Sequence, residues 1–372
     1  MTISSARPES NPSVVSRRGG VQVQNTTPVL TPTGWLSAAD IRVGEVVLGP
    51  RGERIPIRGR GDATGSPLYL AEMSDGSSAV VGPAHVWRIQ SHNDRERGKR
   101  DGRERWRPVD TIDVQSLLAR SRVRDTYIPI VKTIQFDSPP SLMLDPYGLG
   151  LLLGDGCFRL GTPTFTKPEL QLHRALAEAF PGNSQTHLGP TRKGTISLPS
   201  VSGPNVLSAG LRELGLWGEG SWSKFIPDQY LRALPVQRLA LLQGLLDTDG
   251  WVQRNIVGNT GSYLGTSSGR LAGGVVEVVE SLGGTTTVLH RARPRYQGGV
   301  GRPAWIVRVR LPRPLEPFRL ERKLTIWRAG MSGKETPPVR RIISMKYVGV
   351  GNVVTIDVDT AHGLVLGRFV VT

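Results

Sequence analysis

Two apolar stretches of this chain end in the same Asp-Gly pair. They are YGLGLLLGDG at residues 147–156 and LLQGLLDTDG at residues 241–250, and their last aspartates, Asp155 and Asp249, lie 94 residues apart (249 minus 155). Each stretch predicts a buried helix with a small residue at every fourth position. These small residues are Gly150 and Gly154 in the first stretch and Gly244 and Thr248 in the second. Because residues at this spacing share one helical face and let two backbones approach closely, we expect two paired, parallel helices with both aspartates at the same end.

The paired aspartates predict a bound cation. An acidic side chain at a helix C-terminus opposes the helix dipole, at a cost of roughly 0.3 to 1 kcal/mol. Two such carboxylates side by side would also repel each other unless a cation lay between them. One copy of the pattern alone is more often a core helix that ends at a glycine, so the prediction depends on the duplication. The sequence thus predicts a divalent metal site on a pseudo-twofold axis.

The two stretches resemble the motifs of the LAGLIDADG homing endonucleases, of the single-chain kind that carries two motifs. In that family the last aspartate of each motif binds the catalytic metals, which implies that Asp155 and Asp249 are catalytic metal ligands here. The resemblance also assigns their neighbours Gly154 and Thr248 to the metal site, and it implies Mg²⁺ or Mn²⁺ as the cofactor. Asp247 occupies an earlier acidic position that is usually structural.

The family also places a lysine near each scissile phosphate, commonly in a K-x-I-P segment before the second motif. Lys224 in the segment SKFIP matches this pattern, although such a residue can also be a plain surface lysine. Lys224 follows Asp155 by 69 residues (224 minus 155), and Lys323 follows Asp249 by 74 (323 minus 249). Lys323 is therefore the candidate for the symmetric catalytic lysine.

The resemblance implies an α+β fold of two pseudo-symmetric αββαββα repeats, whose sheets form a saddle over the DNA major groove. The segment AWIVRVRLPR alternates strictly, which places Arg308 and Arg310 on one face of a strand and Val307 and Val309 on the other. Exposed arginines can simply be a solvated surface, but here many lie close together, which favours a DNA-facing sheet. The predicted DNA-binding residues are Arg291, Arg293, Arg295, Arg302, Arg308 and Arg310.

Composition agrees with a nucleic-acid partner. The formal net charge is +16, and 39 of the 47 basic residues are arginines, whose planar fork suits phosphates and guanine edges. A GC-rich genome would also favour arginine codons. The one cysteine, Cys157, excludes a disulfide framework and a multi-cysteine zinc site. With neither a signal peptide nor a membrane-spanning apolar run, we expect a cytoplasmic, bacterial or phage-encoded protein that contacts no membrane. The two-motif chain should act as a monomer on double-stranded DNA with a long recognition site.

Four segments are expected along the chain. Residues 1–21 are rich in Ser, Pro and Arg and predict a disordered leader, whereas the texture of residues 22–135 and 335–372 is that of short strands cut by turns. Between them, residues 140–330 form the double-motif endonuclease domain, inserted into the all-β domain. The Arg-rich segment 91–107 is expected to be a basic loop, either an extension onto DNA or a solvated surface.

The β flanks resemble the two halves of a Hint splicing domain, the fold that carries inteins. His85 takes the position of the histidine that strains the upstream scissile peptide, while Gly82 replaces the usual threonine. The intein start falls near Gln22, which is not a cysteine. In the subclass that uses an internal cysteine instead, Thr355 stands at the nucleophile position, and a threonine hydroxyl is a far weaker nucleophile than a thiol. The residues of this splicing remnant are Gln22, His85, Trp87, Thr355, His362 and Thr372.

These features predict a site-specific, metal-dependent double-strand DNA endonuclease with a splicing-inactive Hint remnant. One alternative is an intein, flanked by host-protein exteins, whose terminal His-Asn junction was clipped or misassigned. A second alternative is a DNA-binding regulator with a dead nuclease site, against which the two intact motif aspartates argue.

Overall fold

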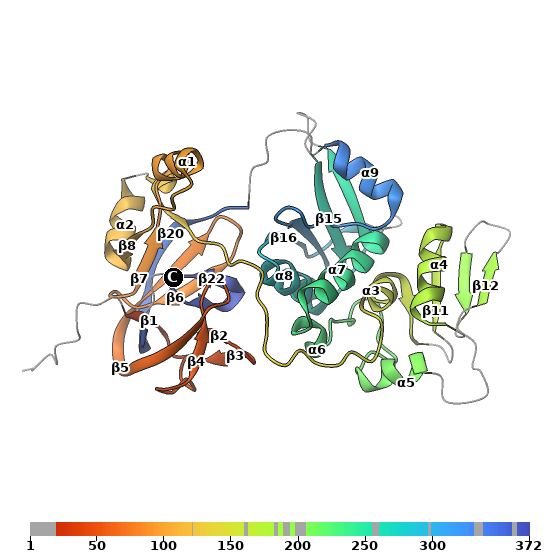
Figure 1. Ribbon diagram of the computed structural model, residues 1–372, viewed down its shortest axis with the longest axis horizontal. Coiled ribbons are helices and arrows are strands. Elements are labelled where there is room, and N and C mark those ends of the chain that lie inside the picture. The colour runs from red at the N-terminus through yellow and green to blue at the C-terminus, as the bar shows by residue number, and fades with distance from the viewer. Residues whose placement is uncertain are drawn as a thin grey trace, which may run out of the picture.

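A computed structural model describes residues 20–120, 122–159, 163–181, 185–188, 194–197, 206–254, 260–296, 299–330, 338–358 and 363–372. The chain forms a β-rich part from its two ends and a helix-containing part from its middle (Figure 1). Most of the predicted leader, residues 1–19, lies outside the described residues. Its predicted end is wrong by one position, because Val21 already pairs in the first strand.

The β-rich part joins the two ends of the chain in one six-stranded sheet of order β4-β5-β6-β1-β20-β9. A second sheet has the order β22-β21-β2-β3, and β7 pairs with β8. The strands are β1 (Val21–Gln24), β2 (Pro28–Thr31), β3 (Gly34–Ser37), β4 (Val46–Leu48), β5 (Arg54–Met73), β6 (Ser78–Val81), β7 (Val86–Ile89), β8 (Arg107–Asp110), β9 (Tyr127–Ile128), β20 (Arg340–Val358), β21 (Val365–Leu366) and β22 (Val370–Val371), with the helices α2 (Thr111–Ala119), η1 (Val123–Asp125) and η2 (Gly367–Phe369). The antiparallel pairing of β20 with β1 and β5 makes the two ends one folding unit despite the long middle segment.

The segment predicted to be a basic loop, residues 91–107, is a helix instead over most of its length. Helix α1 (His92–Asp101) begins at a capping box in which Ser91 and Asp94 bond each other's backbone N–H groups. It ends at Gly102, which adopts the left-handed conformation with a φ of 71°. The caps and the ion pair of Glu96 with Lys99 stabilise this helix, in which no side chain is buried.

The middle of the chain contains two αββαββα repeats, as the family resemblance implied. The first consists of α3 (Pro146–Asp155), β10 (Gly156–Cys157), β11 (Thr164–Lys167), α4 (Leu170–Ala179), β12 (Gln185–Leu188), β13 (Gly194–Ser197) and α5 (Val206–Glu213). The second consists of α7 (Pro235–Asp249), β14 (Gly250–Arg254), β15 (Thr260–Thr266), α8 (Gly269–Ser281), β16 (Thr285–Arg291), β19 (Ala304–Arg310) and α9 (Glu321–Ala329), while α6 (Asp228–Leu231) precedes it and β17 (Arg295–Tyr296) pairs with β18 (Gly299–Val300) inside it. The two sheets have equivalent strand orders, β10-β11-β13-β12 and β14-β15-β19-β16.

Helices α3 and α7 pack against each other through the small residues that the sequence indicated (Figure 1). A Cβ added at Gly150 would lie 2.2 Å from the carbonyl oxygen of Leu241, and one at Gly244 would lie 2.4 Å from that of Tyr147. A Cβ at Gly154 would meet the Thr248 hydroxyl. The prediction of a close helix pair is confirmed, and the leucines on the remaining faces of the pair form the centre of the largest apolar core.

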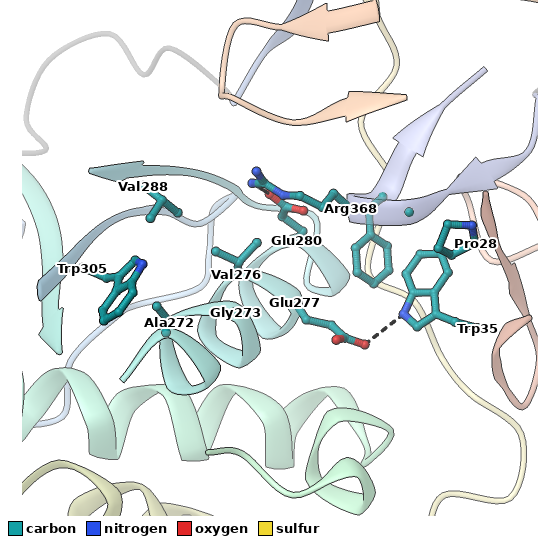
Figure 2. A pocket seen from close by; sticks show the side chains of 13 residues that line it. Pro28, Trp35, Ala272, Gly273, Val276, Glu277, Glu280, Val288, Trp305 and Arg368 are labelled. Atoms are coloured by element: carbon teal, nitrogen blue, oxygen red, sulfur yellow. Dashed lines mark hydrogen bonds and ion pairs between the residues drawn. The ribbon is translucent and has the colours of Figure 1, made fainter. Parts of the chain in front are cut away.

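Buried polar contacts join the two parts of the molecule. Arg340 of β20 bonds Asp75 at 2.6 Å and lies 3.5 Å from Glu280 of α8, and Arg368 of η2 bonds the same Glu280 oxygen at 2.7 Å. Next to these groups, Trp35 donates its indole N–H to Glu277 at 3.0 Å. This contact borders a cavity of about 580 Å³. Figure 2 shows Trp35 of the β-rich part and Trp305 of the helix-containing part among the side chains on its walls. No helix among the described residues is long and apolar enough to cross a membrane.

His85 is part of the core of the β-rich part. Its side chain is fully buried and its ring lies 4.6 Å from that of Trp87, centroid to centroid. Burial lowers the pKa of His85 to about 3, because the charged imidazolium would lose its hydration. His85 is therefore neutral in the folded protein at neutral pH.

Replacing Gly150 with Ala should lower the free energy of unfolding by about 1–3 kcal/mol, because the added methyl group must push the α7 backbone away. Gly273→Ala is the matched control, since a Cβ there meets nothing within 4 Å and alanine favours a helix by about 0.5–1 kcal/mol. Urea denaturation of the three proteins measures both changes. Equal stability of Gly150→Ala and the unaltered protein would contradict the close packing.

His85 should make stability depend on pH below about 6.5. The unfolded chain protonates this histidine near its ordinary pKa of 6.5, whereas the folded chain does so only near 3, so the folded state loses about 1.4 kcal/mol per pH unit as the pH falls through this window. His85→Gln removes this slope, and the exposed His92→Gln serves as control. Denaturation at pH 7.5, 6 and 5 gives the free energy of unfolding of each protein. The values for the unaltered protein and His85→Gln should converge as the pH falls. Parallel pH profiles would contradict the buried neutral state.

Candidate active site at the ends of the paired helices

The two motif aspartates are the last residues of the paired helices. Asp155 ends α3 and Asp249 ends α7, and the following glycines turn each chain into the first strand of its sheet. Gly156 and Gly250 have extended backbones, so positive φ is not the reason for glycine. A Cβ at either position would lie 2.4 Å from a helix carbonyl oxygen, that of Leu152 or Leu246. Glycine thus permits the sharp exit that leaves each carboxylate at the helix end.

A third lysine, which no sequence motif indicated, lies near both aspartates. Lys167 of β11 forms an ion pair with Asp155, and its charge also lowers the pKa of Asp249. The two carboxylates therefore share one neighbourhood. The sequence indicated this contact only weakly. Gly156 pairs with Phe165, so Lys167, two positions further along β11, returns to the end of α3. By the same register the equivalent residue of the second repeat is Thr266, since Gly250 pairs with Leu264.

Burial dominates the acidity of Asp249. The loss of solvent raises its pKa, and the positive charges of Lys167, Lys224 and Lys323 oppose that shift. Within the described part of the chain, no hydrogen bond contributes to this pKa. A carboxylate that is largely dehydrated and balanced only by nearby charge is suited to receive a cation.

Lys224 and Lys323, the predicted catalytic lysines, occupy equivalent places in the two repeats. The Lys224 ammonium donates to the carbonyl oxygens of Leu152, Leu153 and Gly156 at 3.0, 2.9 and 2.7 Å. The Lys323 ammonium binds the corresponding oxygens at the end of α7, those of Leu246, Asp247 and Gly250, at 2.8, 2.7 and 2.6 Å. Both side chains are buried, with exposed fractions of 3% and 6%, and burial lowers the pKa of each to about 8.

The unequal spacing of the two lysines from their aspartates has a local cause. The first hairpin of the second repeat, between Gly250 and Leu264, is five residues longer than that between Gly156 and Phe165 (14 against 9). This difference equals that between the 74-residue and 69-residue spacings. The pairing of Lys224 with Lys323 by symmetry therefore holds in three dimensions.

The donor set fits a hard divalent cation. It comprises the Asp155 and Asp249 carboxylates and the main-chain oxygens of Gly154 and Thr248, which the lysines approach only to 3.4 Å. All are oxygen donors, as Mg²⁺ and Mn²⁺ prefer. Beside the second motif lies a hollow of about 240 Å³, lined in part by Lys167, Thr248 and Lys323, with room for a phosphate group.

Asp247 has a different environment from the terminal aspartates. It is buried and accepts a hydrogen bond of 2.8 Å from the Tyr147 hydroxyl of α3, and the backbone N–H of Arg319 donates to it at 3.0 Å. The residue thus ties α7 to α3 and to the segment before α9, which is a structural position.

The second sheet carries a face of aromatic and basic side chains. Tyr263 of β15 stands opposite Arg308 of β19 and stacks on Trp251 of β14, with 5.5 Å between ring centroids. Arg291 lies on the same face of β16, and Arg308 and Arg291 are exposed whereas Arg310 is half-buried. The opposite face, with Val307 and Val309, is buried in the core. The predicted alternation of this strand is confirmed.

The remaining predicted DNA-binding arginines lie at the edges of this face. Arg293 and Arg295 are exposed between β16 and β18. Arg302 is also exposed, and its guanidinium lies 3.6 Å from the ring centroid of Trp222, which Arg159 of the first repeat approaches to 5.1 Å. The structure thus leaves five of the six arginines exposed and buries Arg310 in part.

The splicing-remnant residues meet around β1. His85 Nδ1 lies 2.9 Å from the Gln22 carbonyl oxygen, which also accepts from the N–H of Gly82 at 3.0 Å. Thr355 of β20 pairs with Gln22 across the sheet. The Gln22 side chain fills the space above Gly82, where a Cβ would lie 2.1 Å from its amide oxygen, and it accepts the N–H of Ala84 at 3.1 Å. The glycine at position 82 and the glutamine at position 22 therefore fit each other, and a threonine at 82 would clash.

The other members of this remnant are less informative. Trp87 is fully buried and donates to Thr111 at 3.3 Å, and Thr372 is buried with its hydroxyl accepting the N–H of Leu364 at 3.2 Å. His362 lies outside the described residues.

Comparisons with known proteins agree with this geometry. A family model described as a LAGLIDADG-like domain matches residues 236–328. Over 369 residues, 95% of this chain, the sequence is 28% identical to a protein of Mycobacterium intracellulare named replicative DNA helicase DnaB. This chain spans 58% of the length of that relative.

Solved structures resemble single parts of the chain. The Msm DnaB1 intein splicing domain bound with zinc is 35% identical over 18% of this chain and 53% of its own, with a TM-score of 0.18. I-DmoI in complex with DNA and Ca is 13% identical over 45% of this chain and 83% of its own, with a TM-score of 0.29. The family model covers the second of the two αββαββα repeats, from α7 to α9, which is therefore LAGLIDADG-like.

Proposed function

We propose that this protein is a site-specific endonuclease that cleaves both strands of double-stranded DNA with the help of a divalent cation. The observation that carries the proposal is the pair of carboxylates, Asp155 and Asp249, at adjacent helix ends within one cluster of lysines. Each repeat supplies one carboxylate, so one chain contains a centre for each strand and can act as a monomer.

Hydrolysis of a phosphodiester needs an attacking water, stabilisation of the charge that develops on the phosphate, and help for the departing 3′ oxygen. A divalent cation, Mg²⁺ or Mn²⁺, held by Asp155 and Asp249 would supply this chemistry. The chain's own part is to hold the two carboxylates rigidly, which the backbone contact of α3 with α7 achieves. Lys167 offsets their negative charge and limits the cost of keeping both ionised.

The face of the second sheet supports DNA as the substrate. Exposed guanidiniums such as Arg308 and Arg291 can bind phosphates or base edges, and Tyr263 and Trp251 lie beside Arg308 on the neighbouring strands β15 and β14. A net charge of +16 adds an attraction that should fall steeply with salt. A long recognition site follows from a sheet that spans several base pairs.

Asp155→Asn or Asp249→Asn should lower the cleavage rate on the order of 100-fold or more while leaving DNA binding intact, because a neutral amide loses the cation but keeps the shape. Target sites come from a selection for cleaved sequences in a random DNA library with Mg²⁺ or Mn²⁺. Cleavage is measured on gels and binding by fluorescence anisotropy in Ca²⁺. Asp228→Asn is the matched control, because the Asp228 side chain is exposed.

Two outcomes would sink the endonuclease proposal. Tight, specific binding without cleavage by the unaltered protein would favour a DNA-binding regulator. Unchanged cleavage by both asparagine variants would place the chemistry elsewhere.

We propose further that the Hint-type part does not splice. Gln22 stands at the start position, and its carbonyl is bound by two donors, the N–H of Gly82 and Nδ1 of His85. The residue across the strand pair, Thr355, carries a hydroxyl, which is a weaker nucleophile at neutral pH than the thiol that splicing by this route needs. The domain then serves as a platform for the nuclease part.

A fusion of the chain between two reporter domains, with His-Asn-Ser added after Thr372, should give no ligated product after about a day at room temperature, because the hydroxyl attacks too slowly. Mass spectrometry measures precursor, branched and ligated forms. Thr355→Cys restores a thiol at this position. Branched or ligated products from this variant alone would show that the weak nucleophile at residue 355 is what prevents splicing. Ligated reporters from the unaltered chain would show that it is an active intein.

A further inference from the structure

We propose that Lys224 and Lys323 are positioning residues that hold the two motif aspartates, and that neither ammonium binds the scissile phosphate. The inference deepens the proposed endonuclease function and rests on it for the reaction concerned. It gives the two lysines a role that differs from the phosphate contact implied by the sequence motif.

The hydrogen-bond donors of both ammonium groups are already used. An ammonium group has three N–H donors, and each lysine makes three short bonds to main-chain carbonyl oxygens. For Lys224 these are 2.7, 2.9 and 3.0 Å long, and for Lys323 they are 2.6, 2.7 and 2.8 Å long. No donor remains for a phosphate oxygen unless one of these bonds breaks.

These bonds stabilise the helix ends. The last carbonyl groups of a helix have no partner within it and carry its negative dipole charge, to which Asp155 or Asp249 adds a full negative charge. Each lysine brings a positive charge to these carbonyls from outside the helix. It joins the last turn to the glycine of the following strand, which fixes the residue between them, the aspartate.

Burial also limits what the two ammonium groups can reach, although the Lys323 side chain forms part of the wall of the hollow beside the second motif. Lys224 and Lys323 have exposed fractions of 3% and 6%, and their ammonium groups lie 4.8 and 5.9 Å from the ring centroids of Phe158 and Phe318. Lys167, whose side chain is 25% exposed and pairs with Asp155, is better placed to meet a phosphate.

The same arrangement occurs in both repeats, which have different sequences around the lysine. Lys224 precedes the second motif helix in a loop, whereas Lys323 belongs to α9. Two different local structures thus deliver an ammonium to the same set of helix carbonyls. This coincidence is expected if the carbonyls are the target.

A spectrum of the unaltered, full-length protein tests the inference without any substitution. With ¹⁵N-labelled lysine, two ammonium signals should exchange slowly with water, and neither should shift when target DNA is added with Ca²⁺ to prevent cleavage. Lys224→Met and Lys323→Met assign the signals. A ¹⁵N–³¹P coupling from either ammonium to the DNA would overturn the proposal, as would rapid exchange of both signals in the free protein.

Cleavage kinetics give a second readout. Lys224→Met should raise the Mn²⁺ concentration for half-maximal cleavage by about 10-fold to 100-fold, as loss of a group that orients a metal ligand commonly does, and saturating Mn²⁺ should recover most of the rate. Lys132→Met, at an exposed position, is the control. A lower rate at saturation with unchanged Mn²⁺ dependence would mean a catalytic lysine instead. Because the ammonium spectrum of the free protein needs no cleavage, an inactive unaltered protein would refute the endonuclease proposal alone.

Discussion

The close contact between the backbones of α3 and α7 is the constraint on which the rest of the structure depends. Gly150 and Gly244 allow each helix to approach the carbonyl oxygens of the other. Gly154 leaves room for the Thr248 side chain. A larger residue at these positions would separate the helices over their whole length. Because the helices end together, the same contact sets how near Asp155 and Asp249 lie, and it also places the two sheets on either side of one axis.

This arrangement concentrates negative charge at one point, and the fold balances it with lysines. Two carboxylates and two helix C-termini meet there, while Lys167, Lys224 and Lys323 come from three other segments of the chain. Lys224 and Lys323 donate to main-chain carbonyl oxygens, and Lys167 forms an ion pair with Asp155. A site of this kind can accept a cation because its carboxylates have few hydrogen bonds to lose.

The β-rich part is bound to this centre through α8, whose inner face packs under the second sheet. Glu280 of α8 receives Arg340 and Arg368 from the β-rich part, and Arg368 also bonds Thr286 of β16 at 3.1 Å. Arg368 and the next residue, Phe369, have φ values of 54° and 50°, a backbone region that costs side-chain-bearing residues about 1–3 kcal/mol each. Arg368 is held there by its bonds to Glu280 and Thr286, so the last segment of the chain takes its shape partly from the helix-containing part.

The sequence by itself determined the paired helices, their small-residue faces, the two repeats and the alternating strand of Arg308. Such features follow from short-range periodicity, and duplication made them readable from a single chain. Helix α1 was not predicted because its sequence is mostly charged and has no apolar periodicity. Only its caps, Ser91 and Gly102, indicate a helix there. Tertiary structure alone decided where the lysine ammonium groups point, that Lys167 meets Asp155, and that Glu280 joins the two parts. The lysine–carbonyl contacts and those of Glu280 bring together residues far apart in the chain, and Lys167 reaches Asp155 across a hairpin. Which of several nearby acceptors a long side chain reaches depends on the packing of whole elements.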